Sequence, residues 1–288
     1  MEQFEDGQHV RLRSRERGTY LHADDDGLGV SLSRRRASMN SAWAVHIYQG
    51  DRGPQYLLLH SAAYGRYLGA TDAPALRGHI GSRVEQCDYG PWEEEAIRWQ
   101  AVGIGSGDNI LLRHVGGRRL RANGGYLSID DSDGAGTMMH WVVERIPARE
   151  DTPRLAALTG MHIYSNTYLM VLCAQLQLRL PRSLSFMLPW RLIQVEQAGA
   201  DESNASFPWA SLVFRGRSAY HLRKKLASRL GVAMDVSNLV MCVRAGMHGR
   251  PTPLVIDLPR SKLTLDIIVF MAGTPAHADL RYPNVDAE

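Results

Sequence analysis

The chain has 288 residues, of which 44% are hydrophobic, and it carries a formal net charge of +3. That length accommodates one large domain or two of ordinary size, with enough apolar residues for real cores. The net charge is too small to indicate a polyanionic partner by itself. Arginine also outnumbers lysine along the whole chain, which is more typical of codon composition than of selected contacts.

The cysteines and the first residues of the chain give an indication of the cellular compartment. Cys87, Cys173 and Cys242 are far apart and form no Cys-x-x-Cys pair. Such a sparse, odd set indicates reduced thiols in a cytoplasmic or nuclear protein. Residues 1–6 are acidic and lack the apolar stretch of a signal peptide, and no run reaches the roughly 18 apolar residues of a membrane span. We therefore expect no membrane span, no metal and no cofactor.

Three similar motifs dominate the first half of the chain. Gly18–Ala23, Gly65–Ala70 and Gly117–Ala122 share the frame G-x-[Y/R]-L-x-A. Six residues before each glycine stands a leucine, and further on each copy ends with a tryptophan in a β-like run. These residues are Leu12, Leu59 and Leu111, and Trp43, Trp99 and Trp141. Internal repetition of this kind indicates architecture before any single residue does.

Each repeat has the pattern of four short strands. In the first repeat, residues 10–13, 20–23, 28–32 and 43–48 have the alternation of half-buried strands, and residues 24–27 have the composition of a turn. One such unit cannot cover its own apolar face, whereas three units around a pseudo-threefold axis can, and barrel closure removes most exposed edges. The pattern predicts a β-trefoil over residues 1–148, with the repeated leucines and tryptophans in its core and the repeated glycines in hairpin turns.

The second half of the chain is organised differently. Residues 149–206 have the composition of a linker of doubtful order, because their apolar part lacks a clean period of 2 or 3.6 and contains prolines. Residues 207–288 predict a small α+β domain whose element order suits a ubiquitin-like roll. Its helix begins after Ser218, as an N-cap, and ends at Gly231. Its strands are expected at residues 211–215, 238–244, 253–258 and 263–271, the last of them central and buried on both faces.

Several of these segments resemble the plant family built on domain of unknown function 569. The resemblance covers roughly residues 1–146 and 207–288 and is most specific in the second half. It implies a first domain similar to the actin-crosslinking, fascin-like β-trefoil, in a plant cytoplasmic or nuclear protein loosely tied to stress responses. It carries over no catalytic residue. The resembling segments include Val10–Ser14, Tyr20–Asp26, Ala42–Val45, Phe214–Ser218, Cys242–Gly246, Thr252–Pro259 and Leu280–Pro283.

Residues 160–197 match nothing in that family and resemble translated non-coding sequence. We hypothesise a gene-model artefact such as a retained intron. The alternative is a real but divergent linker. Peptides detected from inside this window would contradict the artefact hypothesis.

Two acidic segments have the wrong pattern for a cation site. Asp24–Asp26 and Asp130–Gly134 are rich in carboxylates, but the residue twelve positions into a loop counted from Asp130 is Trp141, where an EF-hand needs a glutamate. Both segments are expected to be exposed hairpin turns.

Histidines and glycines also favour structural roles. His22, His60 and His114 lie near equivalent positions of the repeats, but no nucleophile motif accompanies them. The glycines of residues 103–107 are followed by Asp108 rather than by the Lys-Ser/Thr pair of a phosphate loop. No acid, base and nucleophile set can be assembled, so we expect a protein that is not an enzyme.

Arginines of the first and third repeats supply the candidate binding surface. They should project from the face opposite core residues such as Val10 and Leu12, and the two repeats are neighbours around a trefoil axis. We expect one patch made of Arg11, Arg13, Arg113, Arg118, Arg119 and Arg121. It suits an acidic protein filament or phosphoinositide, while the lack of interleaved aromatic residues disfavours nucleic acid. The alternative is a solvated face enriched by codon composition.

A nearby serine adds a candidate modification. Arg35–Ser38 fits the motif of a basophilic kinase, and phosphorylation of Ser38 would place negative charge beside the arginines.

These observations leave two functions open. The first is a non-enzymatic binding or scaffold protein, with actin as the partner that fold analogy suggests. The alternative is a lectin-like carbohydrate-binding module. Many trefoil lectins carry a glutamine two residues before the repeated tryptophan, whereas this chain has Ser41, Ile97 and Met139 there.

Overall fold

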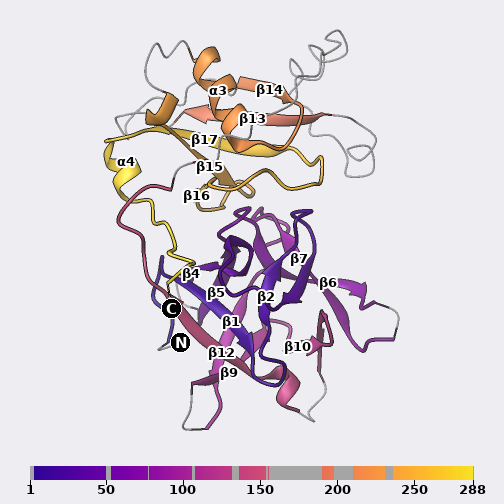
Figure 1. Ribbon diagram of the computed structural model, residues 1–288. Coiled ribbons are helices and arrows are strands. Elements are labelled where there is room, and N and C mark those ends of the chain that lie inside the picture. Colours follow the sequence, from indigo (N-terminus) through magenta and orange to yellow (C-terminus); the bar gives the residue numbers. More distant parts are fainter. Residues whose placement is uncertain are drawn as a thin grey trace. The chain divides into compact units, whose positions relative to one another are not determined.

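The structure is a computed structural model. It describes residues 3–49, 53–76, 78–105, 108–131, 136–153, 155, 190–197, 210–230 and 236–287. The chain forms two compact units, shown in Figure 1. The first, here called the trefoil unit, contains Met1–Asp151, Ala245–Arg250 and Arg281–Glu288. The second unit contains Thr152–Arg244 and Pro251–Leu280.

The trefoil unit contains four strands in each repeat, as the sequence predicts. The first repeat holds β1 (His9–Ser14), β2 (Tyr20–Ala23), β3 (Val30–Ser33) and β4 (Trp43–Gln49). The second holds β5 (Gln55–Ser61), β6 (Tyr67–Pro74), β7 (Ser82–Cys87) and β8 (Trp99–Gly103). The third holds β9 (Asn109–His114), β10 (Arg119–Asn123), β11 (Tyr126–Asp130) and β12 (Trp141–Ile146). Short 3-10 helices, η1 (Met39–Ser41) and η2 (Thr137–Met139), precede β4 and β12.

The first and last strands of each repeat close into a barrel. β1 pairs with β4, β4 with β5, β5 with β8, β8 with β9, β9 with β12, and β12 returns to β1. The remaining strands form three hairpins, β2–β3, β6–β7 and β10–β11, and β11 pairs with both β3 and β7. This ring with its three hairpins is a β-trefoil, and the closed ring leaves none of its six strands with a free edge.

The repeated tryptophans build the core in the same way three times. Trp43, Trp99 and Trp141 are fully buried. Each indole Nε1 donates to the carbonyl of the leucine in its own G-x-x-L motif, namely Leu21, Leu68 and Leu120, at 3.1, 2.8 and 3.1 Å. A buried indole needs such an acceptor. The repeat is therefore a core unit, as the sequence predicts.

The third repeat differs from the other two at one expected core residue. Leu12 and Leu59 are fully buried, but in β9 the equivalent buried side chain is Leu112, and Leu111 is half-buried. Gly18 and Gly65 donate to carbonyls four residues earlier, whereas Gly117 donates to His114, three residues earlier. The third turn is one residue shorter, so counting back six residues reaches the wrong face of the strand. All three glycines have the positive φ expected of them.

The described part of the second unit contains a five-stranded sheet and one long helix. Its strands are β13 (Arg191–Gln197), β14 (Ala210–Phe214), β15 (Leu239–Arg244), β16 (Thr252–Pro253) and β17 (Leu265–Met271), in the order β14-β13-β17-β15-β16. β17 lies at the centre, parallel to β13, and six of its residues are buried, as expected. The strand expected at 253–258 is shorter and pairs with β15 over two residues.

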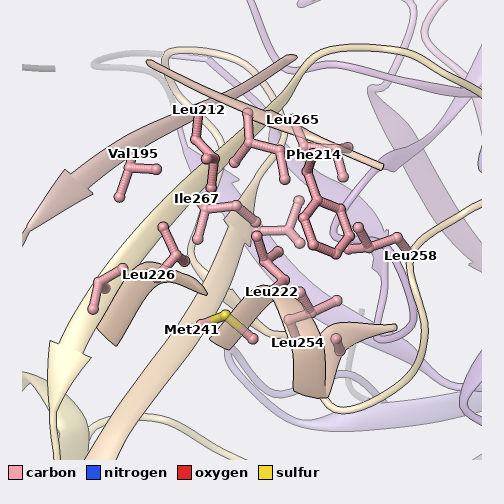
Figure 2. Close-up of a cluster of buried hydrophobic side chains, with 14 of the residues drawn as sticks. Val195, Leu212, Phe214, Leu222, Leu226, Met241, Leu254, Leu258, Leu265 and Ile267 are labelled. Carbon is pink, nitrogen blue, oxygen red and sulfur yellow. The ribbon is translucent and has the colours of Figure 1, made fainter. Parts of the chain in front are cut away.

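One helix covers one face of this sheet. α3 (Ala219–Arg229) begins where Ser218 accepts a hydrogen bond from the His221 amide, as an N-cap should. Leu222 and Leu226 pack with strand residues such as Ile267 in the cluster drawn in Figure 2. A short helix, α4 (Pro275–Ala278), follows β17, and a 3-10 turn, η3 (Val236–Asn238), precedes β15. No helix among the described residues is long and apolar enough to cross a membrane.

The expected boundaries of the second domain need correction. Residues 191–197 were expected in a linker, and in the window of the artefact hypothesis, but they form β13, which lies between β14 and β17. Its apolar residues pair with β14 and β17, and local composition gives no indication of such pairing. Residues 245–250 and 281–288, expected in the second domain, belong to the trefoil unit. Residues 156–189 and 198–209 lie outside the described residues.

Candidate functional site

Arg11 is the first arginine of the patch expected from the sequence, but it does not lie on an exposed surface. Arg11 is fully buried rather than projecting into solvent. Its Nε donates to the carbonyl of Arg36 at 3.0 Å, and its Nη2 donates to the carbonyl of Val285 at 2.5 Å. The expectation for Arg11 is therefore wrong, because residues 281–287 cover this part of β1.

Three further arginines of the expected patch are held by carboxylates. Arg13 lies 2.6 Å from Glu144, and Arg121 lies 2.9 Å from the buried Asp130. Arg118 donates to Ser82 Oγ at 2.7 Å and lies 3.5 Å from Asp72. These partners come from other strands, so spacing along the sequence does not reveal them. Paired arginines at a surface supply much less net charge to a ligand than isolated ones.

The last two expected residues are cross-strand neighbours. Arg113 on β9 is exposed and stands opposite Arg119 on β10. Arg119 in turn stands opposite Asp130 on β11. The structure thus groups Arg113, Arg118 and Arg119 on the third repeat. Arg11 and Arg13 of the first repeat lie against β12 and the chain's last residues instead.

The acidic turn of the first repeat is a hydrogen-bonded hairpin turn. Asp26 Oδ1 accepts from the amides of Leu28 and Gly29, both at 2.8 Å. Asp24 Oδ1 accepts from the Ser31 hydroxyl at 2.5 Å. Among the described residues, no three His, Cys, Asp or Glu side chains are grouped so that they would hold a metal ion. Residues 132–134 of the second acidic segment lie outside the described part of the chain.

The three repeat histidines have three different surroundings. His22 Nδ1 lies 3.6 Å from Asp24. His60 is buried with its ring 5.2 Å from that of Tyr67. His114 Nε2 lies 3.0 Å from the Glu95 carbonyl, and its ring meets Trp99 edge-on at 5.3 Å. The structure does not bring them together into one site.

Sequence reasoning missed a buried cluster of histidines and tyrosines in the trefoil unit. His46 Nδ1 lies 3.3 Å from the Tyr67 hydroxyl, and the rings of Tyr67 and Tyr89 are 5.4 Å apart. Burial lowers the pKa of His9 and of His46 to about 4, and it lowers that of His60 well below 6.5. Burial also raises the pKa of Tyr67 to about 12. These groups are uncharged at neutral pH.

Residues 245–250 cover this cluster. The Tyr89 amide donates to the Ala245 carbonyl at 2.7 Å, and the His248 amide donates to the Tyr89 carbonyl at 3.0 Å. The Arg250 amide donates to the Tyr67 hydroxyl at 3.0 Å, and the Arg250 guanidinium reaches both oxygens of Asp6 at 2.9 Å. Cys242–Gly246 was prominent in the family resemblance, but nothing in its sequence indicates a contact with residues of the second repeat.

Several described apolar side chains of the trefoil unit are exposed, and two places hold four of them. Trp92, between β7 and β8, is 94% exposed. Between β6 and β7, Leu76 and Ile80 are 43% and 69% exposed, and Tyr126 on β11 is 51% exposed. The ring of His79 lies 5.6 Å from that of Tyr126, which connects the β6–β7 turn to the β10–β11 hairpin. Large exposed apolar groups are the informative exception on a surface.

The remaining expected positions are structural. Ser41, Ile97 and Met139, at the positions of the lectin glutamine, are all buried. The Ser38 hydroxyl caps η1 by accepting from the Asn40 amide at 3.2 Å. A phosphate on Ser38 would have to replace this cap.

Two family models match the chain. Residues 1–130 match the β-trefoil domain of unknown function 569, and residues 189–270 match the ubiquitin-like domain associated with it. The chain therefore belongs to the family of domain of unknown function 569, with its trefoil followed by a ubiquitin-like domain. The second match begins two residues before β13 and confirms that this strand is part of the domain.

Solved structures of similar fold cover about half of this chain. A Caenorhabditis elegans protein with unknown function is 16% identical, covering 48% of this chain and 94% of its own, with a TM-score of 0.42. A ricin B-like lectin from Macrolepiota procera, in complex with lactose, is 16% identical, covering 49% and 98%, with a TM-score of 0.41. The designed threefold protein ThreeFoil is 20% identical, covering 47% and 96%, with a TM-score of 0.39. No curated protein matches the chain in sequence.

Proposed function

We propose that this chain is a non-enzymatic binding or scaffold protein whose trefoil docks a partner protein. The observation that carries the proposal is a set of three exposed apolar side chains, Leu76, Ile80 and Tyr126, on two hairpins that meet where the His79 ring contacts Tyr126. This set is here called the hairpin patch. Exposed aromatic and aliphatic side chains that gather at one place are typical anchors of protein interfaces.

The hairpin patch rests on rigid elements. β7 pairs with β11 through Ser82 and Ile129, and a side chain at Gly81 would collide with the Ile129 carbonyl at 2.1 Å. The β6–β7 turn is thus held close against β11. A pre-formed surface loses less conformational entropy on binding than a mobile one.

Arginines border this patch. Arg118 donates to Ser82, two residues after Ile80, and Arg119 stands opposite Asp130 on the strand that carries Tyr126. Apolar anchors with a cationic rim fit an acidic protein surface. Actin, the partner that the family resemblance implies, forms an acidic filament and is the first candidate.

The test is co-sedimentation of the full chain with filamentous actin at low and physiological salt. The double variant Ile80→Ser and Tyr126→Ser should lose most of the pelleted fraction. The variant Arg118→Gln with Arg119→Gln should weaken binding and reduce its salt dependence. Val102→Ser removes a comparably exposed side chain from β8 and serves as the matched control. Wild-type protein that stays in the supernatant with actin at low salt would exclude actin, and affinity capture with the same variants would then identify another acidic partner.

A carbohydrate ligand is the second candidate, favoured by Trp92. A fully presented indole ring followed by Glu93, Glu94 and Glu95 offers a flat apolar face beside hydrogen-bond acceptors. A glycan array with wild type and Trp92→Ala separates the two functions. Glycan signals that depend on Trp92 and not on the hairpin patch would favour the lectin-like alternative.

We further propose that this binding takes place in the cytoplasm or nucleus of a plant cell and contributes to stress responses. The family resemblance supports the plant setting. Cys242 is a free thiol, in keeping with a reducing compartment. Fluorescent-fusion imaging in plant cells before and after osmotic stress tests both statements, and secretion of the fusion would contradict them.

A further inference from the structure

The second unit buries an arginine whose charge is only partly compensated. Arg191, the first residue of β13, is 1% exposed. Its Nη2 donates to the carbonyl of Pro259 at 2.5 Å. Its Nε and Nη1 are buried and have no hydrogen-bond partner. Leaving charged donors unsatisfied in an interior is costly, and such sites in native proteins call for an explanation.

Other cations gather around Arg191. Arg217, which precedes the N-cap of α3, donates from its Nε to the carbonyl of Leu258 at 2.7 Å, one residue before the carbonyl that Arg191 uses. Lys262 follows three residues later in the same loop. Burial lowers the pKa of Lys262, and Arg191, Arg215 and Arg217 lower it further. Burial lowers the pKa of Arg191 to about 10, and Arg217 contributes to this shift. The cations therefore repel one another.

Asp257 and Glu196 have other partners. Asp257 accepts from the Ala219 amide at 3.3 Å, at the start of α3. Glu196, at the other end of β13, pairs with Arg244 at 2.6 Å. Asp266 stands opposite Gln194 and Arg244 in the sheet. Among the described residues, no acid contributes to the pKa shifts of Arg191 and Lys262.

A buried hydroxyl completes the group. Ser261, next to Lys262 and two residues after Pro259, is 4% exposed, and its Oγ has no hydrogen-bond partner. Two guanidinium groups thus donate to the loop of residues 258–262, which itself carries the hydroxyl of Ser261 and the ammonium of Lys262. They offer several donors, and the carboxylate directly before this loop, Asp257, accepts from the start of α3.

We propose that Arg191, Arg217, Ser261 and Lys262 bind a phosphate group, either inorganic phosphate or a phosphomonoester. A phosphate dianion presents several acceptor oxygens, which arginine donors match in geometry and charge. Arg217 and Lys262 are partly exposed and would supply the entry, whereas Arg191 is buried. The N-terminus of the eleven-residue α3 begins two residues after Arg217 and adds favourable potential.

The experiment is calorimetric titration of the full chain at constant ionic strength with inorganic phosphate, with phosphoserine and with chloride. We expect saturable binding of at least one phosphate compound and none of chloride. Arg217→Gln and Lys262→Gln should each weaken that binding by ten-fold or more. Lys224→Gln, which removes an exposed cation from α3, should bind like the wild type. Tighter binding of phosphoserine than of inorganic phosphate would identify a phosphomonoester as the ligand.

Arg191→Met provides a second readout. Without phosphate this variant should unfold at a higher temperature than the wild type, because an uncompensated buried charge has been replaced by an apolar side chain of similar length. Phosphate should raise the unfolding temperature of the wild type but not of this variant. Wild-type protein that takes up no phosphate, or Arg217→Gln and Lys262→Gln variants that bind like the wild type, would overturn the proposal even if Arg191→Met does not fold.

Discussion

At the scale of single residues, the repeated tryptophans combine packing with one hydrogen bond each. Trp141→Phe keeps an aromatic ring but leaves the Leu120 carbonyl without its buried donor and opens a small cavity. We expect a loss of about 2 kcal/mol in the free energy of unfolding of the trefoil unit. Urea denaturation followed by circular dichroism measures it. Trp92→Phe, at an exposed position, should change the value by less than about 0.5 kcal/mol.

A second residue-scale prediction concerns Gly246. Its φ is +83°, and a Cβ there would lie 2.5 Å from the Tyr89 carbonyl oxygen. Gly246→Ala should displace residues 245–250 and cost about 2 kcal/mol through strain and overlap. Hydrogen exchange of the Tyr89 and His248 amides should accelerate, because their partners lie across this contact. Gly216→Ala is the control, since φ is also positive there but nothing lies within 4 Å. Equal exchange in both variants would show that the overlap is unimportant.

Single residues also show what repetition predicts and what it leaves open. The motif identified the tryptophans and Leu12 correctly because the repeats share their chemistry. It misplaced Leu111 because a turn shorter by one residue moves the side chain to the other face. It misplaced Arg11 because strand alternation indicates which face a side chain takes but not which later segment covers that face.

At the scale of elements, the last residues of the chain are part of the trefoil unit. The Arg149 amide donates to the Tyr282 carbonyl at 2.7 Å, and the Asn284 amide donates to the Pro147 carbonyl at 2.8 Å. Val285 packs with Ile146 and also accepts from Arg11. This segment therefore acts as an additional edge element for a domain that precedes it by more than a hundred residues.

Removal of residues 281–288 should destabilise the trefoil unit by an amount on the order of 2 kcal/mol or more, because Arg11 loses an acceptor and apolar surface is exposed. Thermal unfolding of the truncated chain measures the loss. A chain that ends at Ala287 retains the contacts of Arg11 and Arg36 and is the control. An unchanged midpoint after the longer truncation would contradict the role of this segment. Binding assays on the trefoil should accordingly use the full chain rather than residues 1–150.

The histidine cluster predicts how stability depends on pH. The pKa of His9 is about 4 in the folded unit and about 6.5 when unfolded, so between these values the unfolded chain binds more protons. Stability should fall as pH decreases through this window, by about 2 kcal/mol at pH 5 from His9 alone. The nearby Arg281 also opposes protonation of His9, and Arg250 opposes that of His46. Urea midpoints from pH 7.5 to 4.5 should have a shallower pH dependence in His9→Gln, and an identical slope would exclude His9 as a contributor.

At the scale of the whole molecule, elements with a local sequence pattern were predictable, whereas elements that depend on long-range pairing were not. The threefold period predicted the trefoil, and capping by Ser218 with leucines at helical spacing predicted α3, since both signals lie within a few dozen residues. β13 acquires its place from pairing with β14 and β17, and residues 245–250 acquire theirs from contacts with Tyr67 and Tyr89 in the second repeat. The candidate binding surface differs from the expected arginine patch because of long-range pairing as well. Carboxylates such as Glu144 neutralise arginines that have no acidic neighbour in the sequence.

The position of β13 in the sheet also bears on the hypothesis that residues 160–197 are an inserted artefact. If residues 160–197 were all an inserted artefact, their removal would restore the natural second domain. The structure argues otherwise, because β13 lies between β14 and β17 and buries Leu192, Ile193 and Val195. A chain lacking 160–197 should therefore lose the ubiquitin-like fold, seen as loss of amide protection in β17 and rapid proteolysis beyond residue 210. A chain lacking 160–188 keeps β13 and should retain that protection. A folded second unit in the longer deletion would mean that β13 is dispensable and that the artefact extends through residue 197.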